Sequence, residues 1–201
     1  MSTVLVLTSS VLGDASVSNR LVEEVVARLR SQEPDLHVIA RDLGRNPPPH
    51  LTIDAAVALR GGDPANADQA EARALSDNLV AELKAANTVI IGAPMYNFGI
   101  PSTLKSWFDH VLRAGVTFQY SASGAAGLLT EKRAIVIESR GGLYSEGPAQ
   151  AMDAQEPHLR ALLGFMGITD VTFIRAERLA LGAEAHEQAI GAARARIVQA
   201  V

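Results

Sequence analysis

The chain has 201 residues, of which 48% are hydrophobic and 20% are charged, and its formal net charge is −4. This length suits one α/β domain, which would bury roughly 70% of the surface that the unfolded chain exposes. The absence of cysteine excludes disulfides, thiolate metal sites and thiol nucleophiles. The acidic balance argues against a nucleic-acid-binding surface, and no apolar run is long enough to span a bilayer. We therefore expect a single domain over residues 1–201 and, because the N-terminus carries no signal-peptide pattern, a cytoplasmic location.

Five apolar runs have the length and composition of buried strands, and the hydrophobic period between them is that of helices. The expected strands span residues 4–8, 36–43, 88–93, 133–138 and 171–175. One expected helix begins at Ser18, and the others span residues 66–86, 101–111, 158–166 and 184–201. The second run alternates more than the first, as an edge strand would. Strands that alternate with helices predict a parallel sheet with helices on both faces.

In such a sheet, ligands bind beyond the carboxyl ends of the strands, near the point where strand order reverses. The first loop, residues 9–18, carries Ser10 and then Ser16, Val17 and Ser18 at the start of a helix. Hydroxyls and free backbone N–H groups at a helix N-terminus suit a phosphate monoester. The loop lacks both GxxxxGK[ST] and GxGxxG, so neither nucleotide fingerprint is present. Ser16 and Ser18 are also typical helix-capping residues, and both interpretations stay open.

The second loop, residues 94–99, follows the third strand and contains Met95, Tyr96, Asn97 and Phe98. The two aromatic side chains can flank a planar heteroaromatic ring, and the amide of Asn97 can hydrogen-bond to the edge of that ring. Alternatively, the aromatic side chains pack into the core or into a subunit contact.

The third loop follows the fourth strand and consists of Ser139, Arg140, Gly141 and Gly142. Adjacent glycines allow close backbone approach, so main-chain groups could bind a ring that bears carbonyls and an N–H. An ordinary tight turn is the alternative. Together, the three loops predict a ligand with a phosphate at one side and a planar ring at the other, and flavin mononucleotide (FMN) has that shape.

These residues resemble the FMN-dependent NADH-azoreductases, which belong to the flavodoxin-like quinone reductase group. The matching stretches, which cover nearly the whole chain in order, are VLVLTSS, SVSN, LSDNLVAELKAA, APMYNFGIPSTLKSWFDHVLRAGVTFQY, AIVIESRGG and LLGFMGITDV. The resemblance implies an α/β, flavodoxin-like fold with a five-stranded parallel sheet in the order 2-1-3-4-5. It also implies binding roles toward FMN: Ser10, Ser16, Val17 and Ser18 at the phosphate, Met95, Tyr96, Asn97 and Phe98 along the ring system, and Ser139, Arg140, Gly141 and Gly142 at its pyrimidine end.

The activity that the resemblance implies is two-electron, ping-pong transfer from NADH through bound FMN to quinones and azo compounds. The family is homodimeric with active sites at the interface, and NADPH stays open as an alternative donor. We expect no side-chain acid or base, because the three loops contain no well-placed His, Lys or Cys. Phe98, Phe118 and Tyr120 are expected to line the substrate pocket, although a short surface hairpin is the alternative for the last two.

Two other functions fit the same fold: a flavodoxin-type electron carrier, and a flavin-free regulatory or binding module. Segments 52–69, 115–130 and 143–156 exceed a minimal flavodoxin plan and favour an enclosed substrate site over the carrier. The five histidines show no metal-ligand spacing, so no metal is expected, and we expect them to be surface or partly buried residues. Trp107 is expected in the core or in a dimer contact. Glu138, which ends an apolar strand, has no explanation at this level.

Overall fold

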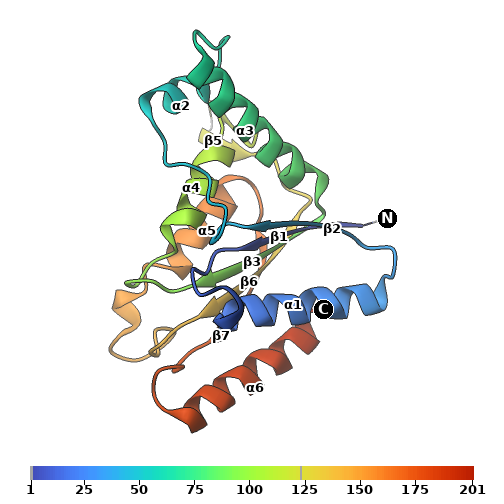
Figure 1. Ribbon diagram of the computed structural model, residues 1–201, viewed down its shortest axis with the longest axis vertical. Helices are drawn as coiled ribbons and strands as arrows, with labels where there is room; N and C mark the ends of the chain where they lie inside the picture. Colours follow the sequence, from blue (N-terminus) through green and yellow to red (C-terminus); the bar gives the residue numbers. More distant parts are fainter. Residues whose placement is uncertain (1, 123) are drawn as a thin grey trace.

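The computed structural model describes residues 2–122 and 124–201, and its centre is a five-stranded parallel sheet (Figure 1). The strands are β1 (Thr3–Thr8), β2 (His37–Asp42), β3 (Thr88–Pro94), β6 (Arg133–Ser139) and β7 (Asp170–Ala176). Their spatial order is β2-β1-β3-β6-β7, which is 2-1-3-4-5 when these strands alone are numbered. The predicted topology is confirmed, and β2 lies at an edge as its alternating sequence indicated.

Helices cover both faces of this sheet (Figure 1). One face carries α1 (Val17–Gln32) and α6 (Ala183–Ala200). The other carries α3 (Ala67–Ala85), α4 (Ser102–Val111) and α5 (Glu156–Phe165), and the short α2 (Ile53–Ala58) packs against α3. Each crossover between parallel strands therefore contains at least one of these helices.

The two hydrophobic cores follow from the alternation of side chains along each strand. Val4 and Val6 of β1 pack toward α1 and α6, whereas Leu5 and Leu7 pack toward the opposite helices. Trp107 of α4 is fully buried in the second core, which confirms the core interpretation for this residue. Because both faces are covered, the strands are apolar throughout their length, as the sequence of β1 indicated.

Two further elements lie outside the central sheet. The helix α2, which we did not expect, is only six residues long, too short to show a helical period. Its N-cap is Thr52, whose hydroxyl accepts a hydrogen bond from the N–H of Ala55 at 3.1 Å. An antiparallel hairpin of β4 (Phe118–Ser121) and β5 (Gly124–Gly127) precedes β6, which confirms that a hairpin forms there. The β5 sequence GAAG carries no side chain larger than a methyl group and so gave no strand signal.

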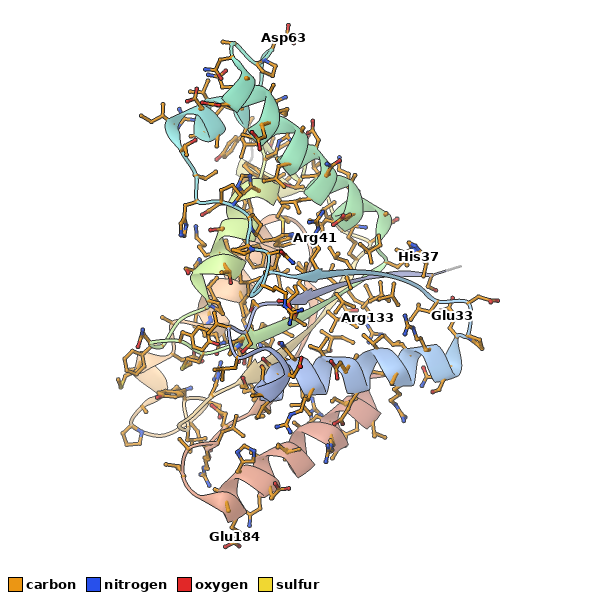
Figure 2. All side chains as sticks on the ribbon, viewed as in Figure 1. Glu33, His37, Arg41, Asp63, Arg133 and Glu184 are labelled. Atoms are coloured by element: carbon orange, nitrogen blue, oxygen red, sulfur yellow. The ribbon has the colours of Figure 1, made fainter. Side chains whose placement is uncertain are left out.

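Polar residues hold the helices to the sheet. Figure 2 shows Arg41 at the carboxyl end of β2, where its guanidinium donates to Glu82 of α3 at 2.7 Å. The expectation that all histidines are at the surface or partly buried is wrong for His110, a residue of α4 that is completely buried. Its ring nitrogen Nε2 lies 3.0 Å from the carbonyl oxygen of Pro49.

Within the described ranges, no helix is both long enough and apolar enough to cross a membrane.

Candidate functional site

The three loops singled out in the sequence lie at the carboxyl ends of the adjacent strands β1, β3 and β6. The first and second loops are joined by Tyr96, whose hydroxyl lies 3.2 Å from the Oγ of Ser10 and accepts from the N–H of Val11 at 3.1 Å. The second and third loops are joined by the N–H of Met95, which donates to the carbonyl of Ser139 at 2.9 Å. The predicted residues therefore form one continuous surface along this edge of the sheet.

The first loop ends at the N-terminus of α1. Ser16 is the N-cap, and its Oγ accepts from the N–H of Asn19 at 3.3 Å, so the capping interpretation is confirmed for this residue. The Oγ of Ser18 lies 3.0 Å from that of Ser16, and both side chains are buried. The N–H groups of Val17 and Ser18 have no partner within the helix because they belong to its first turn. This end of the helix can therefore bind an anion.

The second loop has an unusual backbone. Asn97 and Phe98 both adopt positive φ values, 48° and 72°, although neither is glycine. They occupy the centre of a two-residue turn that is closed by two hydrogen bonds between Tyr96 and Gly99, at 3.0 and 3.1 Å. Such a backbone costs roughly 1 kcal/mol or more per residue, and strain of this kind clusters at ligand sites. The turn presents the Phe98 ring to solvent, with 41% of the residue exposed.

In the third loop, the backbone N–H groups of the glycines are free for a ligand, whereas the arginine side chain is not. The carbonyl groups of Gly141 and Gly142 accept from the N–H groups of Ala180 and Arg178 at 3.0 and 2.9 Å. Among the described residues, no hydrogen bond uses the N–H groups of these two glycines. A planar ligand with carbonyl groups could accept from them. The side chain of Arg140, in contrast, turns inward and is completely buried, so that the loop offers main-chain groups rather than a guanidinium.

Arg140 explains why Glu138 ends an apolar strand. The Nη2 of Arg140 lies 2.8 Å from Glu138, and its Nε donates to Gln155 at 2.9 Å. Burial raises the pKa of Glu138 to about 8, because Arg140 is shared with Asp153 and Glu177 and attracts Glu138 too weakly to offset the lost hydration. Sequence reasoning could not find this arrangement, since its partners lie up to 37 residues from Arg140.

One partner of Arg140, Glu177, fixes the segment that follows the third loop. Although burial opposes it, hydrogen bonds from Ser145, Tyr144 and Arg140 lower the pKa of Glu177. The carboxylate of Glu177 accepts from the N–H groups of Tyr144 and Ser145 at 2.8 and 3.0 Å. The ring of Tyr144 then meets Phe98 edge to face, with ring centroids 6.0 Å apart. Tyr144 thus joins the predicted aromatic wall, which the sequence alone had not indicated.

Phe118 and Tyr120 lie at some distance from this wall. Phe98 accepts a hydrogen bond from the N–H of Ala154, just before α5 begins, at 3.0 Å. Phe118 packs against Phe165 at the other end of α5, with ring centroids 4.5 Å apart. A ten-residue helix is about 15 Å long. Within one chain, therefore, the structure does not bring these two side chains together with Phe98, and 74% of Tyr120 is exposed.

The sequence resembles known proteins over its full length. Residues 2–201 match a family model described as the flavodoxin-like fold. An FMN-dependent NADH:quinone oxidoreductase from Hyphomonas neptunium is 56% identical over 99% of this chain and 95% of its own. A protein of the same name from Ralstonia nicotianae is 49% identical over 96% of this chain and 93% of its own. The crystal structure of an azoreductase from Bacillus anthracis superimposes with a TM-score of 0.91 at 27% identity, covering 100% of this chain and 98% of that one.

Proposed function

Since this chain belongs to the flavodoxin-like family and, within it, to the FMN-dependent NADH:quinone oxidoreductases, we propose that it transfers electron pairs from NADH through bound FMN to quinones and azo compounds. The observation that carries the proposal is the junction of three loops by Tyr96 and Met95 at the ends of β1, β3 and β6. That edge of the sheet is where this fold binds its ligand.

The residues of the three loops fit FMN. The phosphate would accept from the first-turn N–H groups of α1 and from hydroxyls of the first loop. The free N–H groups of Gly141 and Gly142 would bind the pyrimidine carbonyls, and the strained turn at Asn97 and Phe98 would hold the ring from the side. When bound, FMN supplies the two-electron redox chemistry that no side chain of this chain has.

The chain itself would position and orient the reactants and exclude water from them. Phe98 and Tyr144 supply apolar surface against which a nicotinamide or a planar acceptor can stack. The three loops offer no histidine, lysine or cysteine, so we propose that solvent delivers the protons to the product. Substitutions in the loops are then expected to change how the chain binds and orients FMN and the substrates, rather than to remove a proton donor.

A steady-state assay of the FMN-loaded chain tests the activity. We expect NADH oxidation with a quinone and with an azo dye, with parallel double-reciprocal plots, and with NADPH as the poorer donor. Turnover no faster than that of free FMN would refute the proposal. An anaerobic titration that accumulates a one-electron form would instead support the flavodoxin-type carrier, and failure to take up FMN would support a flavin-free module.

Substitutions of two serines of α1 test the proposed phosphate-binding end of the site. Ser18→Ala should weaken FMN binding, measured by flavin fluorescence, because it removes a hydroxyl next to the N-cap Ser16. Ser31→Ala is the matched control, because Ser31 lies at the other end of the same helix. Equal affinities of the two variants for FMN would show that the first loop is not part of the FMN site.

We further propose that two copies pair and that the active sites lie at their interface. Phe98 and Tyr120 are separated by the length of α5, so both can line one pocket only if Tyr120 comes from a second copy. Mixing two inactive variants, one altered at Tyr120 and one in the second loop, should then restore part of the activity. Because NADH is supplied inside the cell, we also propose a cytoplasmic location, which cell fractionation tests.

A further inference from the structure

The side chain of Gln155 connects the second loop to the third. Gln155 directly precedes α5 and is completely buried. The nitrogen of its side-chain amide donates to the carbonyl of Ala93 at 2.8 Å, and the amide oxygen accepts from the Nε of Arg140 at 2.9 Å. Ala93 is the last residue before the second loop, and Arg140 belongs to the third. A single side chain therefore contacts the chain at both loops.

The orientation of this amide follows from its two partners. The Nε–H of Arg140 can only donate, so it faces the amide oxygen, and the carbonyl of Ala93 can only accept, so it faces the amide nitrogen. Rotation of the amide by about 180° would leave both partners without this hydrogen bond, and both residues are completely buried. The contact therefore requires one donor and one acceptor on the same side chain, in one orientation.

An ionised carboxylate at this position could not replace the amide. The guanidinium of Arg140 already has three carboxylate groups within 3.1 Å, which belong to Glu138, Asp153 and Glu177. A further buried negative charge among these groups would be costly, and an ionised carboxylate has no proton to donate to the carbonyl of Ala93. The side chain of Gln155 meets both requirements because it is neutral and carries a donor beside an acceptor.

The main chain at the start of α5 is fixed independently of this side chain. The N–H of Gln155 donates to Asp153 at 2.9 Å, and its carbonyl accepts from the N–H of Leu159 at 3.0 Å. The preceding residue, Ala154, donates to the carbonyl of Phe98 at 3.0 Å. The two residues before α5 therefore contact the second loop both before its turn and within it, and they do so from an anchored backbone.

We propose, on the basis of the proposed function, that Gln155 is a positioning residue that sets the spacing of the second and third loops and thereby the place of the flavin ring. In that function the N–H groups of Gly141 and Gly142 bind the pyrimidine carbonyls, and the strained turn at Asn97 and Phe98 holds the ring from the side. A rigid planar ring meets both sets of groups only if the two loops keep their spacing. The amide of Gln155 ties these loops together without touching the ring.

Gln155→Met tests this role, because methionine has a similar volume and forms neither hydrogen bond. Titration of the full chain with FMN measures the affinity, and the visible circular dichroism of bound FMN reports on how the protein surrounds the ring. We expect the affinity to fall about tenfold and the circular dichroism at FMN saturation to change. An affinity and a spectrum equal to those of the wild type would overturn the proposal.

Gln69→Met is the matched control, because the buried Gln69 also uses both ends of its amide. Its oxygen accepts from the N–H of Ala65 at 2.9 Å, and its nitrogen donates to Asp54 at 3.1 Å, which ties the start of α3 to α2. This variant should shift the midpoint of urea unfolding by a similar amount and keep the affinity of the wild type for FMN. Equal losses of affinity in the two variants would show that Gln155→Met acts through general destabilisation, and would overturn the proposal.

A second variant, Gln155→Glu, decides the question if Gln155→Met does not fold. A protonated carboxyl group carries a donor and an acceptor and can reproduce both contacts, whereas the ionised form, which the guanidinium of Arg140 favours, loses the donor. The FMN affinity of Gln155→Glu, relative to that of the wild type at the same pH, should therefore be lower at about pH 7.5 than at about pH 5. A ratio that is the same at both pH values would overturn the proposal.

Hydrogen exchange of the full chain without FMN separates the role of Gln155 from the proposed function. The N–H of Met95 donates to the carbonyl of Ser139 at 2.9 Å, where the two loops meet. Its protection should fall about tenfold in Gln155→Met and stay unchanged in Gln69→Met. This fall in a chain that does not take up FMN would refute the proposed function and leave Gln155 as the residue that spaces the loops. FMN uptake with equal protection in the two variants would overturn the role of Gln155 and leave the function.

Discussion

Gly44 follows β2 and lies against the backbone at the end of β1. A Cβ atom at this position would lie 2.2 Å from the carbonyl oxygen of Ser10 and 2.8 Å from its carbonyl carbon. Because the obstacle is backbone, a side chain here must displace the start of the first loop. Gly44 therefore packs directly against the first loop, and only the close approach of the two chain segments reveals this role.

Gly44→Ala should weaken FMN binding about tenfold or more, since overpacking of this kind costs about 1–3 kcal/mol and moves Ser10. Titration of the apoprotein with FMN measures the affinity. Gly191→Ala in α6 is the control, because nothing lies within 4 Å of the added Cβ. Ala is a better helix former than Gly by about 1 kcal/mol, so the control should raise stability and leave the affinity unchanged. Unchanged affinity in Gly44→Ala would show that the first loop adapts.

The elements could be predicted to different extents. Buried parallel strands are apolar throughout, so all five strands of the sheet were found to within a few residues at each end. The six residues of α2 and the GAAG sequence of β5 lack a period, and contacts with α3 and α5 select their structure. Of the site, the three loops follow from the topology because carboxyl ends of parallel strands share one edge. The inward turn of Arg140 does not, since its partners Glu177 and Gln155 come from distant positions.

The hairpin of β4 and β5 is docked by a contact between two glycines. A Cβ on Gly127 would lie 2.1 Å from the backbone nitrogen of Gly167, just after α5. Gly127→Ala should therefore undock the hairpin and lower the free energy of unfolding by about 1–3 kcal/mol. FMN affinity should be unaffected, because this contact lies at the opposite end of α5 from the second loop.

Urea denaturation and FMN titration of Gly127→Ala separate these two effects. Gly164→Ala serves as the control, since Gly164 lies in α5 only three residues from Gly167 and has open space at its Cβ. If Gly127→Ala and Gly164→Ala unfold at the same urea concentration, the hairpin is not held by the glycine contact.

For the whole molecule, we infer that residues 1–201 unfold as one unit, because both hydrophobic cores share the same sheet. Trp107 is the single tryptophan and reports on the core between the sheet and α3 to α5. Circular dichroism reports on all helices, including α1 and α6 on the opposite face. The two transitions should coincide in urea, and separate midpoints would show that the two faces unfold independently.

The stability of this unit should also depend on pH through Glu138. The pKa of Glu138 is raised by burial from its ordinary value of 4.5 to about 8 in the folded chain, so between these values the folded state keeps a proton that the unfolded state has released. Stability therefore falls as pH rises through this window, by at most about 1.4 kcal/mol per pH unit, and the loss is complete above the folded pKa. Glu156 and Glu177, whose pKa values are lowered despite burial by hydrogen bonds from arginines and from Ser145 and Tyr144, act in the opposite direction but at lower pH.

Glu138→Gln removes the contribution to the free energy of unfolding that declines between about pH 5 and about pH 8. Urea unfolding across this range should show the wild type losing stability relative to Glu138→Gln, with the variant the more stable at the alkaline end. The stability curve of Glu82→Gln should instead run parallel to that of the wild type, since its ion pair with Arg41 is partly exposed and involves β2, at the opposite edge of the sheet from β7. Parallel curves for the wild type and Glu138→Gln would mean that the folded chain holds Glu138 ionised at neutral pH. Arg140 would then balance the Glu138 charge directly rather than share its own with Asp153 and Glu177.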